Sequence, residues 1–463
     1  MYNAAIVADD LTGAMDTAHG FAARGHRTAV LALPGDVEGS LESDASVVGT
    51  NTDSRYVDRE TAVEAVKEAV RRVPAEVVFK KIDSTLRGNV AAEIDAALTE
   101  AGSDLAVVAP AFPGGGRTTE DGVHLVDGTP VADTEYGADE GGPTDSSIPV
   151  LLSSLDRRVV TVELAVVEEG VDAVRSALRE AVEGANESSE TGPGDADRAH
   201  GAVDRAPIVV ADARTDGDLA TIAEAAADLD TLYVGSNGLA DHVRVPESGP
   251  ASDTVDTEPT DARRSGEEPT DEDAANARAS KDAGAPLGVI GSINSATLTQ
   301  LSKVPSDAVF ELDPVATVTG EGNDGTVSGA LARLRAGESA VVTAAVDRDA
   351  VDRTVAAGAE RGLDGSEVRR RVAAELGETA RRITAEEPPS GVFLTGGDIA
   401  VAVLRALDAT TIRLTGRAVE AGIPIGRLSD GVAAGTPVVT KAGGFGGEAT
   451  IVNCLNALDS SDE

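Results

Sequence analysis

Short apolar runs alternate with helix-like stretches along most of the chain, and this alternation restricts the fold more than any other feature of the sequence. The first run, residues 4–8, ends at two adjacent carboxylates, after which small apolar residues recur at helical spacing as far as Gly25. The same order of apolar run, polar turn and helical stretch returns around residues 77–82 and 105–109. Such units build parallel sheets that helices cover on both faces. The sequence therefore predicts an α/β protein with two domains, each a mostly parallel sheet flanked by helices, and an active site in the interdomain cleft.

Two polar stretches interrupt this pattern. Residues 184–206 form a low-complexity insert, and residues 246–285 carry almost no apolar side chains. We therefore expect an N-terminal domain over residues 1–245, an acidic disordered linker over 246–285 and a C-terminal domain over 286–463. A chain of 463 residues is long enough for two separate cores.

The acidic balance of the chain limits its partners. Its formal net charge is −41, which disfavours nucleic acids and anionic membranes because both bind through clustered Lys and Arg. A disordered scaffold, a cation-binding protein and a salt-adapted enzyme remain, and the regular apolar runs exclude the first. We prefer salt adaptation, since molar salt screens the repulsion between carboxylates. With a single cysteine, Cys454, and no signal peptide or membrane-spanning stretch, we expect a cytoplasmic protein without an intrachain disulfide.

Four polar clusters follow strands of the predicted N-terminal domain, at residues 9–13, 51–55, 83–89 and 110–118. Parallel strands bring such clusters to one edge of the sheet. The clusters supply carboxylates that can accept hydrogen bonds from hydroxyl groups, and guanidinium groups that suit a carboxylate: Asp9, Asp10, Asp83, Arg55, Arg87 and Arg117. The alternatives are a helix cap for an aspartate and a surface ion pair for each arginine. Together the clusters predict a pocket for a small polyhydroxylated acid.

Glycine-bearing turns follow three strands of the predicted C-terminal domain, in the sequences GSINSAT, GGDIA and AGGFGGEAT. Backbone amides in such turns, backed by a helix dipole, bind phosphate, and glycine lets the ligand approach closely. Asp398 follows Gly396 and Gly397, and it either binds Mg²⁺ or caps the next helix. Lys441 either reaches a phosphate or the leaving oxygen, or it is only a charged residue at a strand end. An acid pocket and phosphate turns in separate domains suggest phosphoryl transfer.

Other nucleotide and metal chemistries find little support. The Walker motif G-x-x-x-x-G-K-[ST] is absent. Residues 444–449 match the dinucleotide fingerprint G-x-G-x-x-A, but too few residues follow for the second strand and acidic ribose ligand of a Rossmann unit. The histidines show no metal-ligand spacing.

A series of motifs resembles the four-carbon acid sugar kinase family, in the order of that family: ADDLTGAMD (residues 8–16), KKIDSTLRGN (80–89), PAFPGGGRTTEDG (110–122), VDGTPVADTEY (126–136), VGSNGLA (234–240), IGSINSATLTQ (290–300), LTGGDIA (394–400), GIPIG (422–426) and TKAGGFG (440–446). The resemblance covers nearly the whole chain except the two polar inserts. Members of this family phosphorylate threonate, erythronate or 3-oxo-tetronate with ATP. The KKIDSTLRGN motif is closer to the threonate and erythronate kinases than to the 3-oxo-tetronate branch.

The resemblance implies an N-terminal acid-sugar domain and a C-terminal ATP domain. It assigns these residues to the sugar-acid pocket: Asp9, Asp10, Thr12, Gly13, Asp83, Ser84, Arg87 and Arg117. We also place Arg55 in this pocket. The resemblance assigns these residues to the ATP site: Ser292, Gly396, Gly397, Asp398, Ile399 and Gly443. We add Asn294 and Gly444, which lie in the same turns. The sequence GGDI at residues 396–399 replaces the GGET common in the family, so a threonine hydroxyl that could contact phosphate or ribose is missing.

We therefore expect an ATP- and Mg²⁺-dependent kinase for a threonate- or erythronate-type acid, with Asp10 or Asp83 as the base and Lys441 at a phosphate or the leaving oxygen. The expected partners are the sugar acid and ATP, with a homodimer left open and no nucleic acid or membrane. A 3-oxo-tetronate kinase is the alternative within the family. A sensor that binds both ligands without turnover, favoured by Ile399, is a second alternative. The third alternative is an aldolase or epimerase with a Schiff base on Lys80 or Lys81. Strand alternation directs one of these two lysines toward the pocket and the other away from it.

Overall fold

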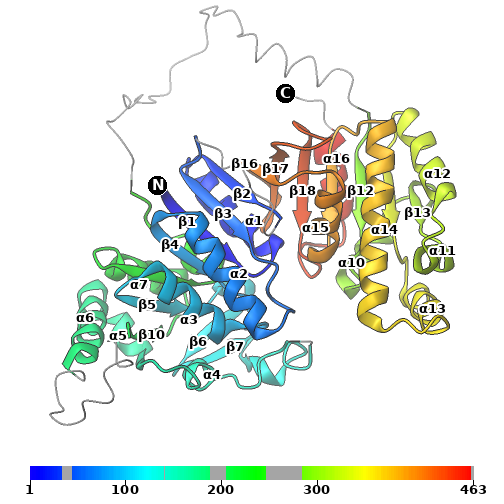
Figure 1. Cartoon of the computed structure of the whole chain (residues 1–463). Coiled ribbons are helices and arrows are strands. Elements are labelled where there is room, and N and C mark those ends of the chain that lie inside the picture. The colour runs from blue at the N-terminus through cyan, green and yellow to red at the C-terminus, as the bar shows by residue number, and fades with distance from the viewer. Residues whose placement is uncertain (34–43, 140, 188–204, 247–283, 460–463) are drawn as a thin grey trace, which may run out of the picture. The chain divides into compact units, whose positions relative to one another are not determined.

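The computed structural model describes residues 1–33, 44–139, 141–187, 205–246 and 284–459 (Figure 1). Nearly all of the predicted linker and most of the predicted insert lie outside these residues. The chain forms two compact units, one of Met1–Val245 with Thr410–Ala418 and the other of Pro246–Ala409 with Val419–Glu463. Each unit is built on a mostly parallel sheet with helices packed on it, which confirms the predicted α/β fold.

The main sheet of the first unit consists of β1 (Tyr2–Ala8), β2 (Thr28–Leu31), β3 (Val47–Asn51), β4 (Ala75–Lys81), β5 (Leu105–Ala109), β9 (Val159–Val162), β10 (Ile208–Ala211), β11 (Thr231–Gly235) and β16 (Thr411–Glu420). Their order is β16-β2-β3-β1-β4-β11-β5-β10-β9. All these pairs are parallel except β16 with β2, which is antiparallel. A small antiparallel sheet contains β6 (Arg117–Glu120), β7 (Val123–Val126) and β8 (Thr129–Pro130).

Strand β16 joins this sheet from outside the predicted N-terminal domain. Residues Thr410–Ala418 belong to the first unit, although they lie inside the range of the predicted C-terminal domain. Ile412 pairs with Val30, so a segment from late in the chain covers the edge of β2.

The register of the parallel strands decides where the polar clusters emerge. Ala8 is aligned with Asn51 of β3 and with Lys81 of β4. Lys81 is aligned with Gly235 of β11, which in turn is aligned with Ala109 of β5. These five strands therefore end at the same level, and the residues that follow them meet at one edge of the sheet, as predicted.

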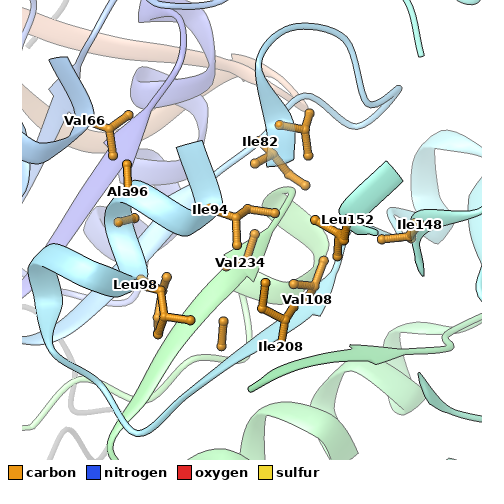
Figure 2. Packing of buried hydrophobic residues seen from close by; sticks show 14 of the residues in the cluster. Val66, Ile82, Ile94, Ala96, Leu98, Val108, Ile148, Leu152, Ile208 and Val234 are labelled. Carbon is orange, nitrogen blue, oxygen red and sulfur yellow. The ribbon is translucent and has the colours of Figure 1, made fainter. Parts of the chain in front are cut away.

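Helices cover the strands of the first unit: α1 (Leu11–Ala23), α2 (Arg59–Arg72), α3 (Val90–Ala101), α4 (Ile148–Leu152), α5 (Leu164–Glu168), α6 (Val171–Glu187), α7 (Asp216–Ala226) and α8 (Asn237–Ala240). The core between α3 and the sheet is largely apolar. Ile94 and Leu98 of α3 pack with Val108 of β5 and Val234 of β11 (Figure 2). Burying such side chains contributes about 1.5–3 kcal/mol each, so the edge that carries the polar clusters rests on a firm support.

The second unit repeats the architecture with strands β12 (Leu287–Ile290), β13 (Val309–Glu311), β14 (Ala340–Thr343), β15 (Val392–Thr395), β17 (Ile423–Leu428) and β18 (Pro437–Lys441). Their order is β13-β14-β12-β15-β18-β17, with only β17 antiparallel to its neighbour β18. Its helices are α10 (Ser295–Leu301), α11 (Pro314–Thr319), α12 (Asp324–Arg335), α13 (Arg348–Ala359), α14 (Gly365–Glu386), α15 (Gly397–Ala406) and α16 (Thr450–Asp459). None of the described helices in either unit combines the length and the apolar character needed to cross a bilayer.

Candidate active site

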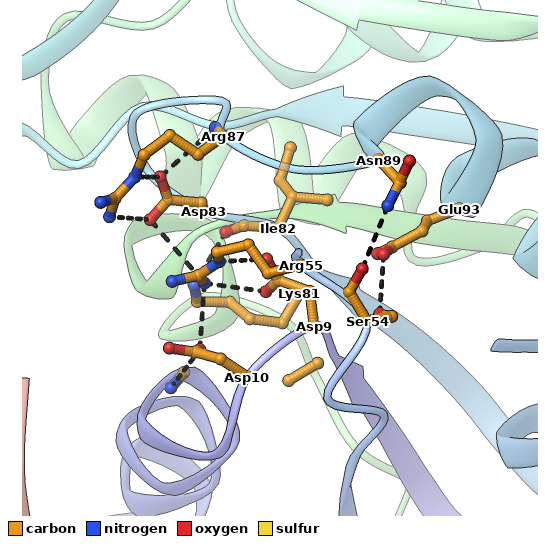
Figure 3. A network of polar contacts seen from close by, with 12 residues as sticks. Asp9, Asp10, Ser54, Arg55, Lys81, Ile82, Asp83, Arg87, Asn89 and Glu93 are labelled. Carbon is orange, nitrogen blue, oxygen red and sulfur yellow. Dashed lines mark hydrogen bonds and ion pairs between the residues drawn. The ribbon is translucent and has the colours of Figure 1, made fainter. Parts of the chain in front are cut away.

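Arg55 lies at the centre of the polar residues that follow the strands of the first unit (Figure 3). Its Nε donates to Asp9 Oδ2 at 2.7 Å, and its Nη2 donates to Asp9 Oδ1 at 3.1 Å. The same Nη2 lies 3.0 Å from Asp10 Oδ1 and 3.8 Å from Asp83 Oδ1. One guanidinium therefore joins the three predicted carboxylates, and its charge keeps the pKa of Asp9 below the usual value although burial alone would raise it.

Asp83 is held by a second arginine from its own turn. Arg87 Nε donates to Asp83 Oδ2 at 2.7 Å and Arg87 Nη2 donates to Asp83 Oδ1 at 3.2 Å, while Thr85 Oγ1 donates to Asp83 Oδ2. Burial would raise the pKa of Asp83, but Arg55 and Arg87 outweigh it and hold that pKa well below its usual range. Arg87 also reaches Asp139, with Nη1 at 2.9 Å from Oδ2.

Asp10 caps a helix and also contacts Arg55. It is the N-cap of α1, where its Oδ1 accepts from the Gly13 amide at 2.8 Å and its Oδ2 accepts from Thr12 Oγ1 at 2.7 Å. It also contacts Arg55. A Cβ at Gly13 would lie 2.6 Å from Asp10 Oδ1 and 3.4 Å from Lys81 Nζ, so only glycine permits this close approach.

The two consecutive lysines at the end of β4 point to opposite sides of the sheet, as strand alternation predicts. Lys80 Nζ pairs with Glu93 Oε2 at 2.8 Å, and these side chains are 0% and 2% exposed. Glu93 also accepts from Ser54 Oγ at 2.7 Å, which ties α3 to the loop that carries Arg55. Lys81 Nζ lies beside Gly13 instead and donates to Ile82 O at 2.7 Å. A Schiff base on Lys80 would require breaking a fully buried ion pair.

Tyr136, the last residue of the motif at 126–136, connects Arg117 to Arg87. The Cζ atoms of Arg87 and Arg117 lie 5.5 Å and 5.9 Å from the centroid of its ring. Arg117 Nη2 donates to the Tyr136 hydroxyl at 3.4 Å, and Arg117 Nη1 donates to Gly115 O. The buried Arg117 Nε finds no acceptor among the residues that the structure describes.

His124 supports the turn after β4 from the small antiparallel sheet. Its Nε2 lies 2.9 Å from Ser84 O and its Nδ1 lies 3.0 Å from Thr119 Oγ1. These partners fit a neutral ring that donates from Nε2 to the carbonyl and accepts at Nδ1 from the hydroxyl. Burial lowers the pKa of His124 to about 4, so the ring is neutral at pH 7 and positions Ser84.

This histidine predicts a pH-dependent loss of stability. Its pKa in the fold, about 4, lies below the ordinary value of 6.5, so the unfolded chain takes up the proton first as the pH falls. The contribution of His124 to the free energy of unfolding is therefore fully present above pH 6.5. About 3 kcal/mol of this free energy is lost on acidification to pH 4. We expect His124→Gln, measured by urea unfolding between pH 7 and 4.5, to flatten this dependence. Equal slopes for wild type and His124→Gln would contradict the prediction.

In the second unit, the turns after β12 and β18 interlock. Thr297 Oγ1 of α10 donates to Gly443 O at 2.7 Å and to Ser292 Oγ at 3.2 Å. A Cβ at Gly443 would lie 2.5 Å from Ser292 Oγ, so glycine is required there. Asn294 caps α10 by accepting a 2.9 Å hydrogen bond from the Ala296 amide. Gly444 follows Gly443 in the turn after β18 and lies next to Asn294. The predicted residues of these two turns are thus brought together.

Lys441 lies beneath the glycine loop that follows β18. Its side chain is fully buried, and Nζ donates to the carbonyl oxygens of Ala442 at 2.8 Å, Gly443 at 3.0 Å and Phe445 at 3.3 Å. Burial lowers its pKa to about 8. In this arrangement the ammonium group holds the glycine loop from beneath.

The turn after β15 presents an uncapped helix terminus. Gly396 is the N-cap of α15 with φ of 97°, and no side chain of the described residues caps the first amides of this helix. Asp398 is exposed in the first turn. Ile399 is buried and lies so close to Gly291 that a Cβ there would overlap it. Within the described residues, no group of three or more His, Cys, Asp or Glu side chains could hold a metal ion.

Two family models match the chain, one to each half of the sequence. A model described as a sugar-binding N-terminal domain matches residues 4–243, and one described as a nucleotide-binding C-terminal domain matches residues 287–451. A D-threonate kinase from Bordetella bronchiseptica is 34% identical, over 98% of this chain and 96% of its own length. A D-erythronate kinase from Heliobacterium modesticaldum is 31% identical, over 99% and 97%. A 3-oxo-tetronate kinase from Pseudomonas fluorescens is 29% identical, over 98% and 96%.

Two crystal structures share the fold over nearly their whole length. A Salmonella typhimurium protein has a TM-score of 0.72 at 19% identity and covers 97% of this chain and 98% of its own. A Haemophilus influenzae protein has a TM-score of 0.68 at 20% identity, with coverage of 98% and 100%. At these identities the likeness concerns the fold alone.

Proposed function

The chain belongs to the four-carbon acid sugar kinase family and is a phosphotransferase acting on a hydroxyl of a sugar acid, and we propose that it phosphorylates a threonate- or erythronate-type acid with ATP. The observation that carries the substrate class is the set of carboxylates and guanidinium groups gathered around Arg55 at one sheet edge. Carboxylates recognise hydroxyl groups, and guanidinium groups recognise the carboxylate of the acid. A 3-oxo-tetronate substrate remains the alternative within the family.

In the first unit, we place the carboxylate of the substrate at Arg117 and Arg87. No acceptor among the described residues faces the buried Nε–H of Arg117, and a ligand oxygen would satisfy it. Tyr136 holds both guanidinium groups against its ring, which limits their motion and lowers the entropic cost of binding. The remaining predicted contacts to the substrate are those of Asp9, Asp10, Thr12, Gly13, Arg55, Asp83 and Ser84.

In the second unit, we place the phosphates of ATP at the N-terminus of α15. No side chain in the described parts of the chain caps the amides there, and the helix dipole favours an anion. The ATP site would be completed by Ser292, Asn294, Gly443 and Gly444. Lys441 would act indirectly, by holding the loop that carries Gly443 and Gly444. Ile399 would affect the nucleotide indirectly, because its packing sets the position of the turn after β15.

Asp398 fits the demands of Mg²⁺, which commonly uses one or two carboxylates together with substrate phosphates. Its carboxylate is exposed in the first turn of α15 and accepts no hydrogen bond from the described residues. When bound with ATP, Mg²⁺ neutralises charge that develops on the phosphates. An interdomain cleft as the place of transfer remains a prediction.

The test is ADP release from Mg²⁺-ATP in multimolar KCl, with a panel of threonate, erythronate and 3-oxo-tetronate stereoisomers. We expect turnover with one threonate or erythronate isomer, and no turnover of that acid by Arg117→Ala, which should still bind ATP. High KCl is chosen because a net charge of −41 requires screening. Preferred turnover of 3-oxo-tetronate would redirect the substrate assignment. Binding of ATP and acid without any ADP release would favour a sensor and contradict the kinase, and borohydride trapping of a carbonyl substrate would favour a Schiff-base enzyme.

A further inference from the structure

The three carboxylates around Arg55 are poorly suited to accept a proton from the substrate. Both oxygens of Asp9 and both oxygens of Asp83 accept from guanidinium groups. Both oxygens of Asp10 accept from the first turn of α1. A lone pair that already accepts a hydrogen bond is not free to take up the proton of a substrate hydroxyl. Asp10 and Asp83, the bases predicted from the sequence, are therefore better equipped to bind than to take up a proton.

Asp16 is a fourth carboxylate near this cluster, and its environment is different. It lies on α1 three residues after Gly13, so the two residues share one face of the helix. Asn237 Nδ2 donates to Asp16 Oδ2, while Asn237 Oδ1 accepts from Thr17 Oγ1 at 2.6 Å. The amide is thus fixed from both sides and holds one oxygen of Asp16. The other oxygen, Oδ1, accepts no hydrogen bond from any residue in the described parts of the chain.

Asp16 is also electrostatically suited to exchange a proton near neutral pH. It is half-buried, and burial raises its pKa to about 6. Lys81, from β4, lowers this pKa, whereas Asp241, which follows α8, and Asp10, at the N-terminus of α1, raise it. Lys81 Nζ sits beside Gly13 and near Arg55 and Asp10 in Figure 3, so it links Asp16 to the cluster. A base with a pKa close to the working pH is the most effective one.

We propose that Asp16 is a catalytic residue whose Oδ1 accepts the proton of the substrate hydroxyl during phosphoryl transfer, a role that rests on the proposed kinase function. The hydroxyl oxygen forms a bond to the γ-phosphorus of ATP, and the bond between that phosphorus and the bridging oxygen breaks. ADP leaves with the electron pair of the broken bond, and the hydroxyl proton moves to Asp16. Asn237 keeps the carboxylate oriented, and Lys81 stabilises its charged form before the transfer.

The first experiment compares Asp16→Asn with the wild-type enzyme, using the acid that gives turnover. Asparagine keeps the shape and can still accept from Asn237, but it cannot take up the proton. We expect kcat to fall by about 10²–10⁴-fold, while the Kd values for the sugar acid and for ATP, measured by calorimetry, change less than about threefold. A residue with only a structural role would not separate kcat from both affinities in this way.

The pH profile provides a second, independent readout. The wild-type kcat should rise through about pH 6, since Asp16 must be ionised to act. Asp241→Asn removes a nearby negative charge that is not part of the site, so it should move this limb to lower pH and leave kcat at pH 8 unchanged. Asp16→Glu, with its longer side chain, should retain the limb at a lower kcat. It also replaces Asp16→Asn as the test if that variant does not fold.

The possible outcomes separate the two proposals. An Asp16→Asn variant that keeps more than a tenth of the wild-type kcat, or that loses affinity for the acid as strongly as kcat, overturns the role of Asp16. An acidic limb that does not move in Asp241→Asn overturns it as well. A folded wild-type enzyme that releases no ADP with any acid contradicts the kinase function itself, and with it the assignment of Asp16.

Discussion

Replacing Arg55 with alanine is expected to lower kcat/KM by at least about a hundredfold and to reduce the free energy of unfolding by about 3–5 kcal/mol. Arg55 bonds both oxygens of Asp9 and contacts Asp10. Its removal leaves buried carboxylates without their shared cation, and Asp9 is only 4% exposed. The loss of stability should shrink at acidic pH, because protonation of Asp9 then removes the unpaired charge.

Urea unfolding and steady-state kinetics at constant KCl concentration measure both effects. Arg71→Ala is the matched control, since Arg71 forms its ion pairs with Glu68 and Glu100 at the surface and should cost less than about 1 kcal/mol. Arg55→Lys keeps the charge but loses the planar fork, so it should recover stability more than activity. An Arg55→Ala variant as stable and active as the control would show that the cluster around Arg55 is not the sugar-acid site.

Replacing Glu93 with glutamine is expected to reduce the free energy of unfolding by about 3–5 kcal/mol, because it leaves Lys80 charged and unpaired inside the protein. The pair is separated by 2.8 Å, and neither side chain is more than 2% exposed. Glu93 also fixes Ser54, the residue before Arg55. We therefore expect KM for the sugar acid to rise while KM for ATP stays near its wild-type value, as measured in the ADP-release assay.

A double replacement distinguishes an unpaired charge from lost packing. Lys80→Met combined with Glu93→Leu removes both charges and should regain at least half of the lost stability, since apolar residues can replace a buried ion pair at little cost. Glu64→Gln, which breaks the partly exposed pair of Glu64 with Lys67, serves as a control and should cost less than about 1 kcal/mol. A Glu93→Gln variant that behaves like Glu64→Gln would contradict the importance of the buried pair.

The common edge of the strands could be predicted from the sequence, because it follows from local patterns. The alternation of apolar runs and helices implies parallel strands, and polar residues directly after each strand must then meet. Strand alternation likewise separates Lys80 from Lys81 without any knowledge of their partners. The presence of both Asp9 and Asp10 next to Gly13 indicated more than a helix cap, and the structure places Asp10 in the cap and Asp9 on Arg55.

What could not be predicted depends on contacts between distant parts of the chain. Nothing local to Arg55 indicates that it is the shared cation of three carboxylates. Asp16 reads as an ordinary polar position of α1, and only the approach of Asn237 and Lys81 makes it unusual. Lys441 was read from its place at a strand end, whereas the path of the following loop decides which atoms its ammonium group meets.

The origin of strand β16 has a consequence for how the protein is made. During synthesis, residues 1–245 leave the ribosome long before Thr411–Glu420, which pairs with β2. Until then the edge of β2 has free amide and carbonyl groups, and such an edge invites pairing with other chains. The edge of β2 in the nascent first unit therefore stays unpaired while most of the second unit is translated. A gene split at the boundary between the two family models would encode an N-terminal product that lacks its own edge strand.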